Sequence, residues 1–223
     1  MQRREGFIEK CWDFDGAALP SEFSGVVSGD ATVAVKGSGG AQVGEVDITI
    51  AATSEAEVAY LYQGDKLTIP IARLQAVEFT AKIASSMAAA GSDAIAFAIG
   101  LISAFNSTLD SVTALALFRK KAGASNLLTV ETDDNTVDKN DIATGVSVQY
   151  GSYQRFLIDF QKKSDVKFYV HDGKMFKRVA LTTVFDMSNY TGSLQLFAYL
   201  SKASSTDTNV LTIDEIDIRY EKT

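Results

Sequence analysis

Hydrophobic residues occupy every second position along much of the chain. In the segment 77–83 they fill the odd positions, and the even positions carry glutamate, threonine and lysine. The segment 155–160 repeats the pattern with Phe156, Ile158 and Phe160. Successive side chains of a β-strand point to opposite faces of a sheet, so this period of two predicts strands with one buried face. Helical periodicity is scarce, and an all-β fold follows.

Two segments, 94–101 and 112–118, are apolar on both faces, which is typical of central strands covered on both sides. One face of 94–101 carries only alanine and glycine, so we expect something to pack closely against it. The only predicted helix is the small-residue stretch 85–90. The alternation elsewhere predicts further strands at 6–14, 31–36, 43–51, 56–62, 67–72, 126–132, 144–150, 165–171, 174–180, 194–201 and 210–221.

Length and composition suit one large β-sandwich, so we expect residues 1–223 to form a single domain. The net charge of −7 argues against nucleic acid as a partner, because such binding needs clustered Lys and Arg. No apolar run approaches the roughly 20 residues that span a bilayer. The N-terminal residues 1–6 are basic, but no apolar stretch follows them, so they do not resemble a secretory signal. The single Cys11 cannot form an internal disulfide, which indicates either assembly in a reducing cytoplasm or indifference to redox conditions.

Asp172 and Gly173 separate two alternating segments and give the sharpest turn signal in the chain. An Asp-Gly pair in this position suits a type I′ hairpin, whose two central residues need positive φ. We therefore predict a two-residue hairpin turn at Asp172–Gly173, with a structural role.

Residues 154–160 followed by 166–174 resemble the centre of a concanavalin A-like (laminin-G-like) jelly roll, in which a strand leads to an aromatic-Val-x-Asp-Gly hairpin. The stretch 211–220 is similar to the closing strand of that superfamily, which pairs near the N-terminal strand. The resemblance covers about 76–221 and implies a two-sheet antiparallel jelly-roll sandwich. It does not imply one function, because lectins, glycosidases, adhesion modules and viral surface proteins share the scaffold.

The sharpest catalytic candidate is Glu215-Ile216-Asp217, because laminarinase-type glycosidases of this superfamily carry Glu-x-Asp-x-(x)-Glu. The third carboxylate is missing here, since Arg219 and Tyr220 stand where it should be. Glu221 shares the strand face but lies about 20 Å from Glu215 in a regular strand. We therefore predict that the chain is not an enzyme and has no catalytic residues.

Other candidate sites are weaker. The lone His171 lacks a nucleophile motif, and Cys11 lacks a zinc-ligand cluster. The acidic stretch 133–141 could hold calcium but lacks the spacing of a calcium loop, so a solvated turn is favoured, with no metal and no cofactor. Tyrosine rings stack on sugars and occur at interfaces, so five of them are candidates for contact with a glycan or a partner: Tyr150, Tyr153, Tyr169, Tyr190 and Tyr199.

Asp214 has the same strand parity as Ile216, Ile218 and Tyr220, which predicts a structural carboxylate on the buried face. A buried carboxylate must find hydrogen-bond donors, so we expect backbone amides or an arginine beside it.

A jelly roll with no secretion signal, no disulfide and no catalytic constellation favours a virion-associated structural protein, such as a phage capsid decoration or head-surface protein. Its expected location is the virion, assembled in the host cytoplasm. The expected partners are a capsid or other virion protein and further copies of the chain, without nucleic acid or membrane. We expect residues 1–5 to form a partner-contacting arm through Arg3 and Arg4. The alternatives are a carbohydrate-binding module or lectin and, remotely, a glycosidase.

Overall fold

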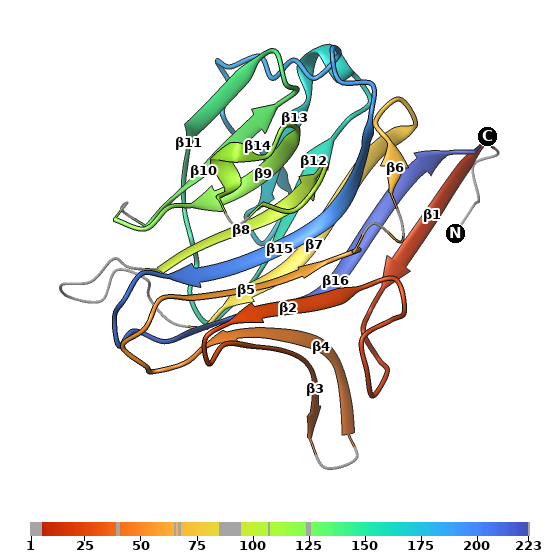
Figure 1. Cartoon of the computed structure of the whole chain (residues 1–223). Coiled ribbons are helices and arrows are strands. Elements are labelled where there is room, and N and C mark those ends of the chain that lie inside the picture. Colours follow the sequence, from red (N-terminus) through yellow and green to blue (C-terminus); the bar gives the residue numbers. More distant parts are fainter. Residues whose placement is uncertain are drawn as a thin grey trace.

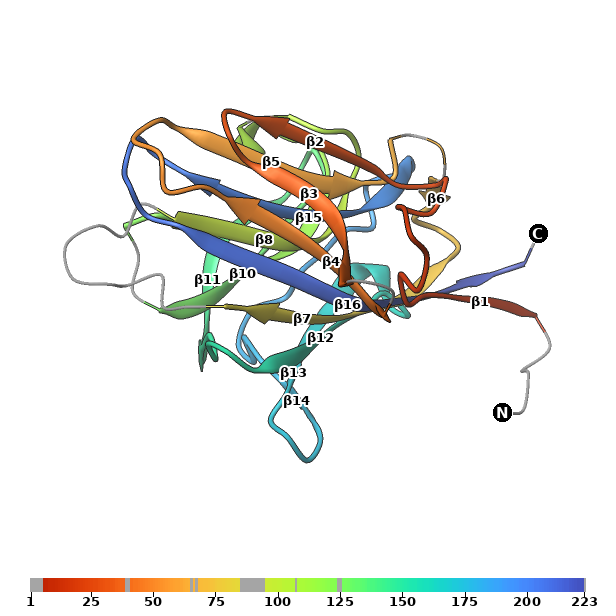
Figure 2. The same cartoon turned by 90° about the horizontal axis from the view of Figure 1, so that it is seen from below.

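The computed structural model describes residues 6–38, 41–64, 66, 68–84, 95–106, 108–123 and 126–222. Paired antiparallel strands form two eight-stranded sheets, whose strands overlap in the view of Figure 2. Within the described residues, helix is limited to two short 3-10 turns, η1 (Leu109–Ser111) and η2 (Lys163–Asp165). None of the described helices is long and apolar enough to cross a membrane. The predicted two-sheet antiparallel jelly roll is thereby confirmed.

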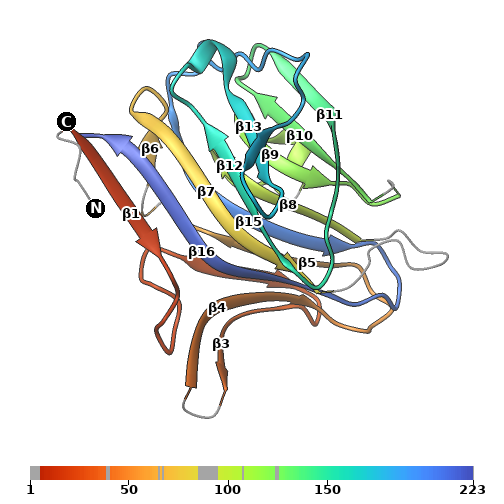
Figure 3. The ribbon, with the colours of Figure 1, turned by 180° about the vertical axis from the view of Figure 1, so that it is seen from behind.

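The first sheet, sheet A, has the order β14-β13-β12-β7-β16-β4-β3, and β1 pairs with the C-terminal part of β16. Figure 3 shows this sheet from its outer side, with β3 and β4 bending away from the other strands. Its strands are β1 (Phe7–Trp12), β3 (Thr32–Ser38), β4 (Ala41–Ile50), β7 (Leu74–Ile83), β12 (Tyr153–Asp159), β13 (Lys167–His171), β14 (Phe176–Arg178) and β16 (Asn209–Glu221).

The second sheet, sheet B, has the order β11-β10-β9-β8-β15-β5-β2, with the short β6 paired to β15. These strands form the layer that faces sheet A and are labelled in Figure 1. They are β2 (Ser24–Ser28), β5 (Glu57–Tyr62), β6 (Ile69–Pro70), β8 (Ile95–Ile102), β9 (Leu115–Lys120), β10 (Leu127–Asp133), β11 (Asp138–Ser147) and β15 (Ser193–Lys202).

The main core lies between the two sheets and is built from the alternating apolar residues of their facing sides. Phe118 of β9 shows how the layers interlock, because its ring lies 5.2 Å from those of both Phe156 and Phe168 on sheet A. Such tilted and edge-on aromatic pairs add about 0.5–1.5 kcal/mol each beyond the burial of their area. The apolar residues that recur at every second position in the sequence are therefore the residues that form this core.

The first and last strands lie side by side, as expected from the resemblance. β1 pairs antiparallel with β16 from Phe7 opposite Glu221 to Trp12 opposite Ile216. β1 and the C-terminal part of β16 accordingly lie side by side in Figures 1 and 3.

The structure also corrects several sequence predictions. β2 was not predicted, because Ser24–Ser28 carries two adjacent valines rather than an alternation. The strand predicted at 112–118 begins only at Leu115, after η1, and the one predicted at 144–150 is β11, which begins at Asp138. The predicted helix at 85–90 lies outside the described residues.

A buried ion pair fixes one end of sheet B. Lys202 of β15 and Glu57 of β5 are cross-strand neighbours, their charged atoms are 3.4 Å apart, and both side chains are fully buried. Lys202 Nζ also donates to the carbonyls of Ala51, Thr53 and Asp207. Glu57 accepts from the Ala51 amide and the Thr53 hydroxyl. The pair therefore ties the 51–56 and 203–208 loops to the sheet.

Replacing Lys202 with Met should lower the free energy of unfolding by about 3–5 kcal/mol, because it leaves the Glu57 carboxylate buried without its cation. Adding Glu57→Gln should recover part of this loss, since the remaining amide carries no charge. Urea denaturation of both variants measures the difference, with Lys174→Met in an exposed hairpin as the matched control. A loss no larger than that of the control would contradict the structural role of the pair.

Candidate functional site

The outer face of sheet B carries a second apolar cluster, separate from the main core. Its buried members come from four strands and from the 103–114 loop, and they are Tyr60, Ala98, Ile102, Leu109, Val112, Leu115, Leu117, Phe197 and Tyr199. Val26, Val58, Tyr62 and Phe105 are partly buried against them. Sheet B is thus covered on both faces over its centre.

The 103–114 loop makes this cover possible. Leu109 and Val112 point back onto the sheet, and the ring of Phe105 stacks on that of Tyr60 with centroids 3.7 Å apart and planes inclined by 13°. The small face of β8 leaves the necessary space. A Cβ at Gly100 would lie only 2.2 Å from the Ala116 carbonyl oxygen. The sequence expectation of close packing on this face is therefore confirmed.

A charged group holds the loop at its side. Arg119 of β9 contacts Asp110 of η1 at 2.5 Å and Glu131 of β10 at 2.8 Å, and Lys121 lies 3.7 Å from Asp110. Burial raises the pKa of Glu131, although the Arg119 guanidinium opposes this shift. No sequence motif predicts this charged group, because only the strand register brings Asp110, Arg119 and Glu131 together.

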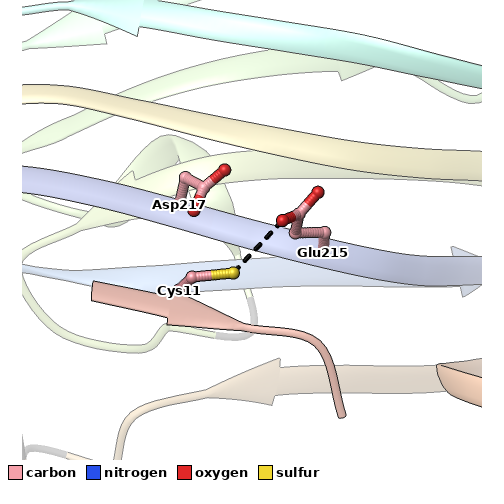
Figure 4. A group of neighbouring side chains, drawn as sticks. All are labelled: Cys11, Glu215 and Asp217. Carbon is pink, nitrogen blue, oxygen red and sulfur yellow. Dashed lines mark hydrogen bonds between the residues drawn. The ribbon is translucent and has the colours of Figure 1, made fainter. Parts of the chain in front are cut away.

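The outer face of sheet A is polar and more open, and it carries the cluster shown in Figure 4. Cys11 of β1 lies opposite Asp217 of β16, and its Sγ donates a hydrogen bond of 3.2 Å to Glu215 Oε1. The sulfur and the carboxylate oxygens all lie within 4.8 Å of one another. Burial, the Glu215 and Asp217 hydrogen bonds and the charges of these carboxylates raise the pKa of the thiol far above its ordinary value.

The same face corrects the prediction for Asp214. A register shift between Ile213 and Glu215 forms a β-bulge in β16 that turns Asp214 away from the core, so the carboxylate is only partly buried. No hydrogen bond to Asp214 is present within the described residues. Burial and the nearby Glu45 and Glu215 charges raise its pKa. The parity argument was wrong because a bulge shifts the side-chain alternation by one residue.

The five candidate tyrosines do not form one surface. Tyr153 and Tyr169 lie on the outer face of sheet A, where the Tyr153 hydroxyl contacts Glu45 and Lys82. Tyr199 lies in the apolar cluster of sheet B. Tyr150 and Tyr190 pack against the main core, and their hydroxyls donate to Asn126 Oδ1 and the Ser193 carbonyl.

The acidic stretch 133–141 spans the end of β10, the turn 134–137 and the start of β11. Asp134 is buried, and its carboxylate accepts from the Thr136, Val137 and Asn189 amides, while Asp133 accepts from the Asn135 amide. Asp133 and Asp134 therefore hold the backbone of this turn through their hydrogen bonds to its amides.

The hairpin at Asp172 is present, but its turn differs from the prediction. His171 pairs with Phe176, so the loop has four residues rather than two. Gly173 has φ of +91°, and Asp172 Oδ1 accepts from the Lys174 and Met175 amides. His171 Nδ1 accepts from the Gly173 amide. Arg3 and Arg4 lie outside the described residues.

No protein-family model matches the sequence, and no curated protein matches it in sequence. The fold is similar to solved structures. A non-specific endo-β-1,3(4)-glucanase of family GH16 superimposes with a TM-score of 0.65 at 11% identity, covering 100% of this chain and 94% of the other. The Emp47p carbohydrate recognition domain gives 0.63 at 9% identity, covering 100% of both. Peanut lectin gives 0.61 at 14% identity, covering 96% and 97%. The chain therefore has a concanavalin A-like jelly-roll fold, shared with glucanases and lectins.

The raised pKa of Cys11 predicts slow alkylation, because the thiolate is the reactive form. Iodoacetamide at pH 8 should modify the folded protein more slowly than the urea-unfolded chain. Asp217→Asn should accelerate modification of the folded protein, since it removes a neighbouring negative charge, whereas Asp30→Asn at a distant exposed site should not. Equal rates for the folded and unfolded chain would contradict the arrangement in Figure 4.

Replacing Asp214 with Asn should raise stability at pH 7 by up to about 0.5 kcal/mol. The folded state raises the pKa of Asp214, so the wild-type protein loses stability as the pH rises through the ordinary Asp value of 3.8 towards the raised one. The advantage of the variant should vanish well below pH 3.8. Thermal melts across this range measure it, and a variant less stable than wild type at pH 7 would show that the carboxylate has donors after all.

Proposed function

We propose that the chain is a non-enzymatic, virion-associated structural protein, such as a phage capsid decoration or head-surface protein. The non-enzymatic part rests on what occupies the outer faces of the two sheets. On sheet B, the 103–114 loop occupies the centre of the face. On sheet A, Glu215 and Asp217 are the nearest approach to a glycosidase pair.

That pair does not suit glycoside hydrolysis. Retaining enzymes place two carboxyl groups about 5–5.5 Å apart on either side of the sugar bond. Glu215 and Asp217 match only the first two positions of the glucanase motif, and Glu215 already accepts a hydrogen bond from Cys11. Arg219 stands two residues further along the same face, so the third position of the glucanase motif carries a cation.

The structural part of the proposal is supported by how the sandwich is stabilised. Cys11 is a free thiol, and the sheets are held by the aromatic core and the Lys202–Glu57 pair. Such a molecule can assemble in the reducing cytoplasm of a host and act afterwards on a particle. Its partners would be a capsid protein and further copies of the chain, with Arg3 and Arg4 as the proposed contact of the N-terminal arm.

One observation favours glycan binding as a second candidate. Tyr62 and Phe105 are only partly buried on the outer face of sheet B, so their rings could stack on a sugar beside the closed cluster. The Emp47p carbohydrate recognition domain and peanut lectin have this fold.

Particles purified on density gradients from the organism that carries the gene should contain the chain in stoichiometric amounts, as measured by quantitative mass spectrometry. The purified protein should release no reducing sugar from β-glucans, and Glu215→Gln should change nothing. Turnover abolished by Glu215→Gln would overturn the non-enzymatic proposal. The lectin alternative would be favoured by saturable binding on a glycan array that is lost in Tyr62→Ala, together with absence of the chain from the particles.

A further inference from the structure

Open sheet edges are the places where a β-sandwich can recruit another chain. The terminal strand of a sheet has one side of its backbone unpaired, which makes it a template for a further strand. Natural proteins protect such edges with charged side chains, bulges, prolines or very short strands. β1 and β6 also pair on one side only, but β1 carries Glu9 and Lys10, and β6 has two residues, one of them a proline. Within the described residues, the main paths of the sheets end at four strands: β3 and β14 in sheet A, and β11 and β2 in sheet B.

Three of these four edges carry such protection. β14 has only three residues and includes Lys177 and Arg178. β3 carries Lys36 and a register shift between Val35 and Gly37. β11 begins with charged residues, and its pairing to β10 shifts register twice.

The fourth edge, β2, has none of them. Its sequence Ser-Gly-Val-Val-Ser contains no charge and no proline, and it pairs with β5 in unbroken register. None of its five residues is buried, and Val27 is 46% exposed. Figure 2 shows β2 at the outer margin of its sheet.

We propose that β2 is a self-association edge that pairs antiparallel with β2 of a second copy of this chain. A two-fold axis at Val26 places Ser24 opposite the partner's Ser28 and Gly25 opposite the partner's Val27. The polarity of the strand reads the same in both directions, so this arrangement opposes small or apolar residues to one another and leaves no charge at the centre.

The charges that flank β2 complement each other in this arrangement. Lys66 lies at the N-terminal end, where its Nζ contacts the Ser21 carbonyl and the Ser24 hydroxyl. Asp30 and Glu55 lie at the C-terminal end, where Glu55 accepts from the Asp30 amide. An antiparallel pair brings Lys66 of each copy toward the partner's Asp30 and Glu55. A parallel pair would bring like charges together instead, so the charges favour the antiparallel alignment.

Side chains next to the edge add apolar area to the backbone pairing. Val26, Val58, Tyr62 and Phe105 are partly buried on the outer face of sheet B. Pairing at β2 continues this strip across the two-fold axis and joins the two B sheets into one. The inference does not depend on the proposed virion role, because it concerns only the free edge.

The test is the mass of the full chain in solution as a function of concentration, by sedimentation equilibrium. Wild-type protein should form a concentration-dependent dimer, and the amides of 24–28 should exchange with deuterium more slowly as the dimer fills. Val27→Lys should abolish dimerisation, because it places a charge next to the two-fold axis, and at concentrations where the wild type is monomeric it should leave the melting temperature unchanged. Val184→Lys is the matched control, since Val184 is 59% exposed and lies far along the chain from β2. It should dimerise like wild type.

A charge-reversal pair tests the register. Lys66→Glu should weaken dimerisation about tenfold, and adding Asp30→Lys should restore it, because the two positions face each other across the axis. A wild-type chain that stays monomeric up to its solubility limit would overturn the proposal. So would a Val27→Lys variant that still dimerises, because another surface would then be responsible.

Discussion

The central strands of sheet B are buried on both faces, and the rest of the molecule depends on this constraint. One face of β8 and β15 packs against sheet A, and the other packs against the 103–114 loop. The alanine and glycine face of β8 leaves room for this second contact. Gly100 is also required by the neighbouring strand β9, because a Cβ there would collide with the Ala116 carbonyl. The same packing that stabilises the sandwich therefore fills the centre of a face that could otherwise receive a ligand.

The sequence was sufficient to predict the sandwich because its core is periodic. Strands with one polar face, such as β7 and β12, carry the alternation that defines them, and the two apolar segments were correctly expected to be central. β2 was missed because edge strands bury little and need no pattern. The limits of β9 were misplaced because Val112 is apolar for contact with the outer cluster and not as part of a strand.

The candidate sites were harder to predict, because they depend on register. The bulge at Asp214 leaves no mark in the sequence, yet it moves that carboxylate off the core side and beside Glu215 and Glu45. The Arg119 group joins residues of η1, β9 and β10, and the Cys11 cluster joins the first and last strands. The tyrosines share a residue type but are distributed over both outer faces and the core, so composition alone could not define a binding surface.

Charged side chains and the backbone of an edge strand differ in whether they find partners within the chain. On the outer face of sheet A, Arg155 pairs with Glu78 at 2.5 Å, and Lys36 with Glu45 at 2.8 Å, so these charges are satisfied within the chain. The buried Lys202 and Glu57 satisfy each other in the same way. Backbone groups on the outer side of an edge strand have no partner strand, and they remain available for pairing wherever no charge or bulge disturbs them. β2 is such an edge, because it carries neither a charge nor a register shift and so keeps the outer side of its backbone open to a further strand.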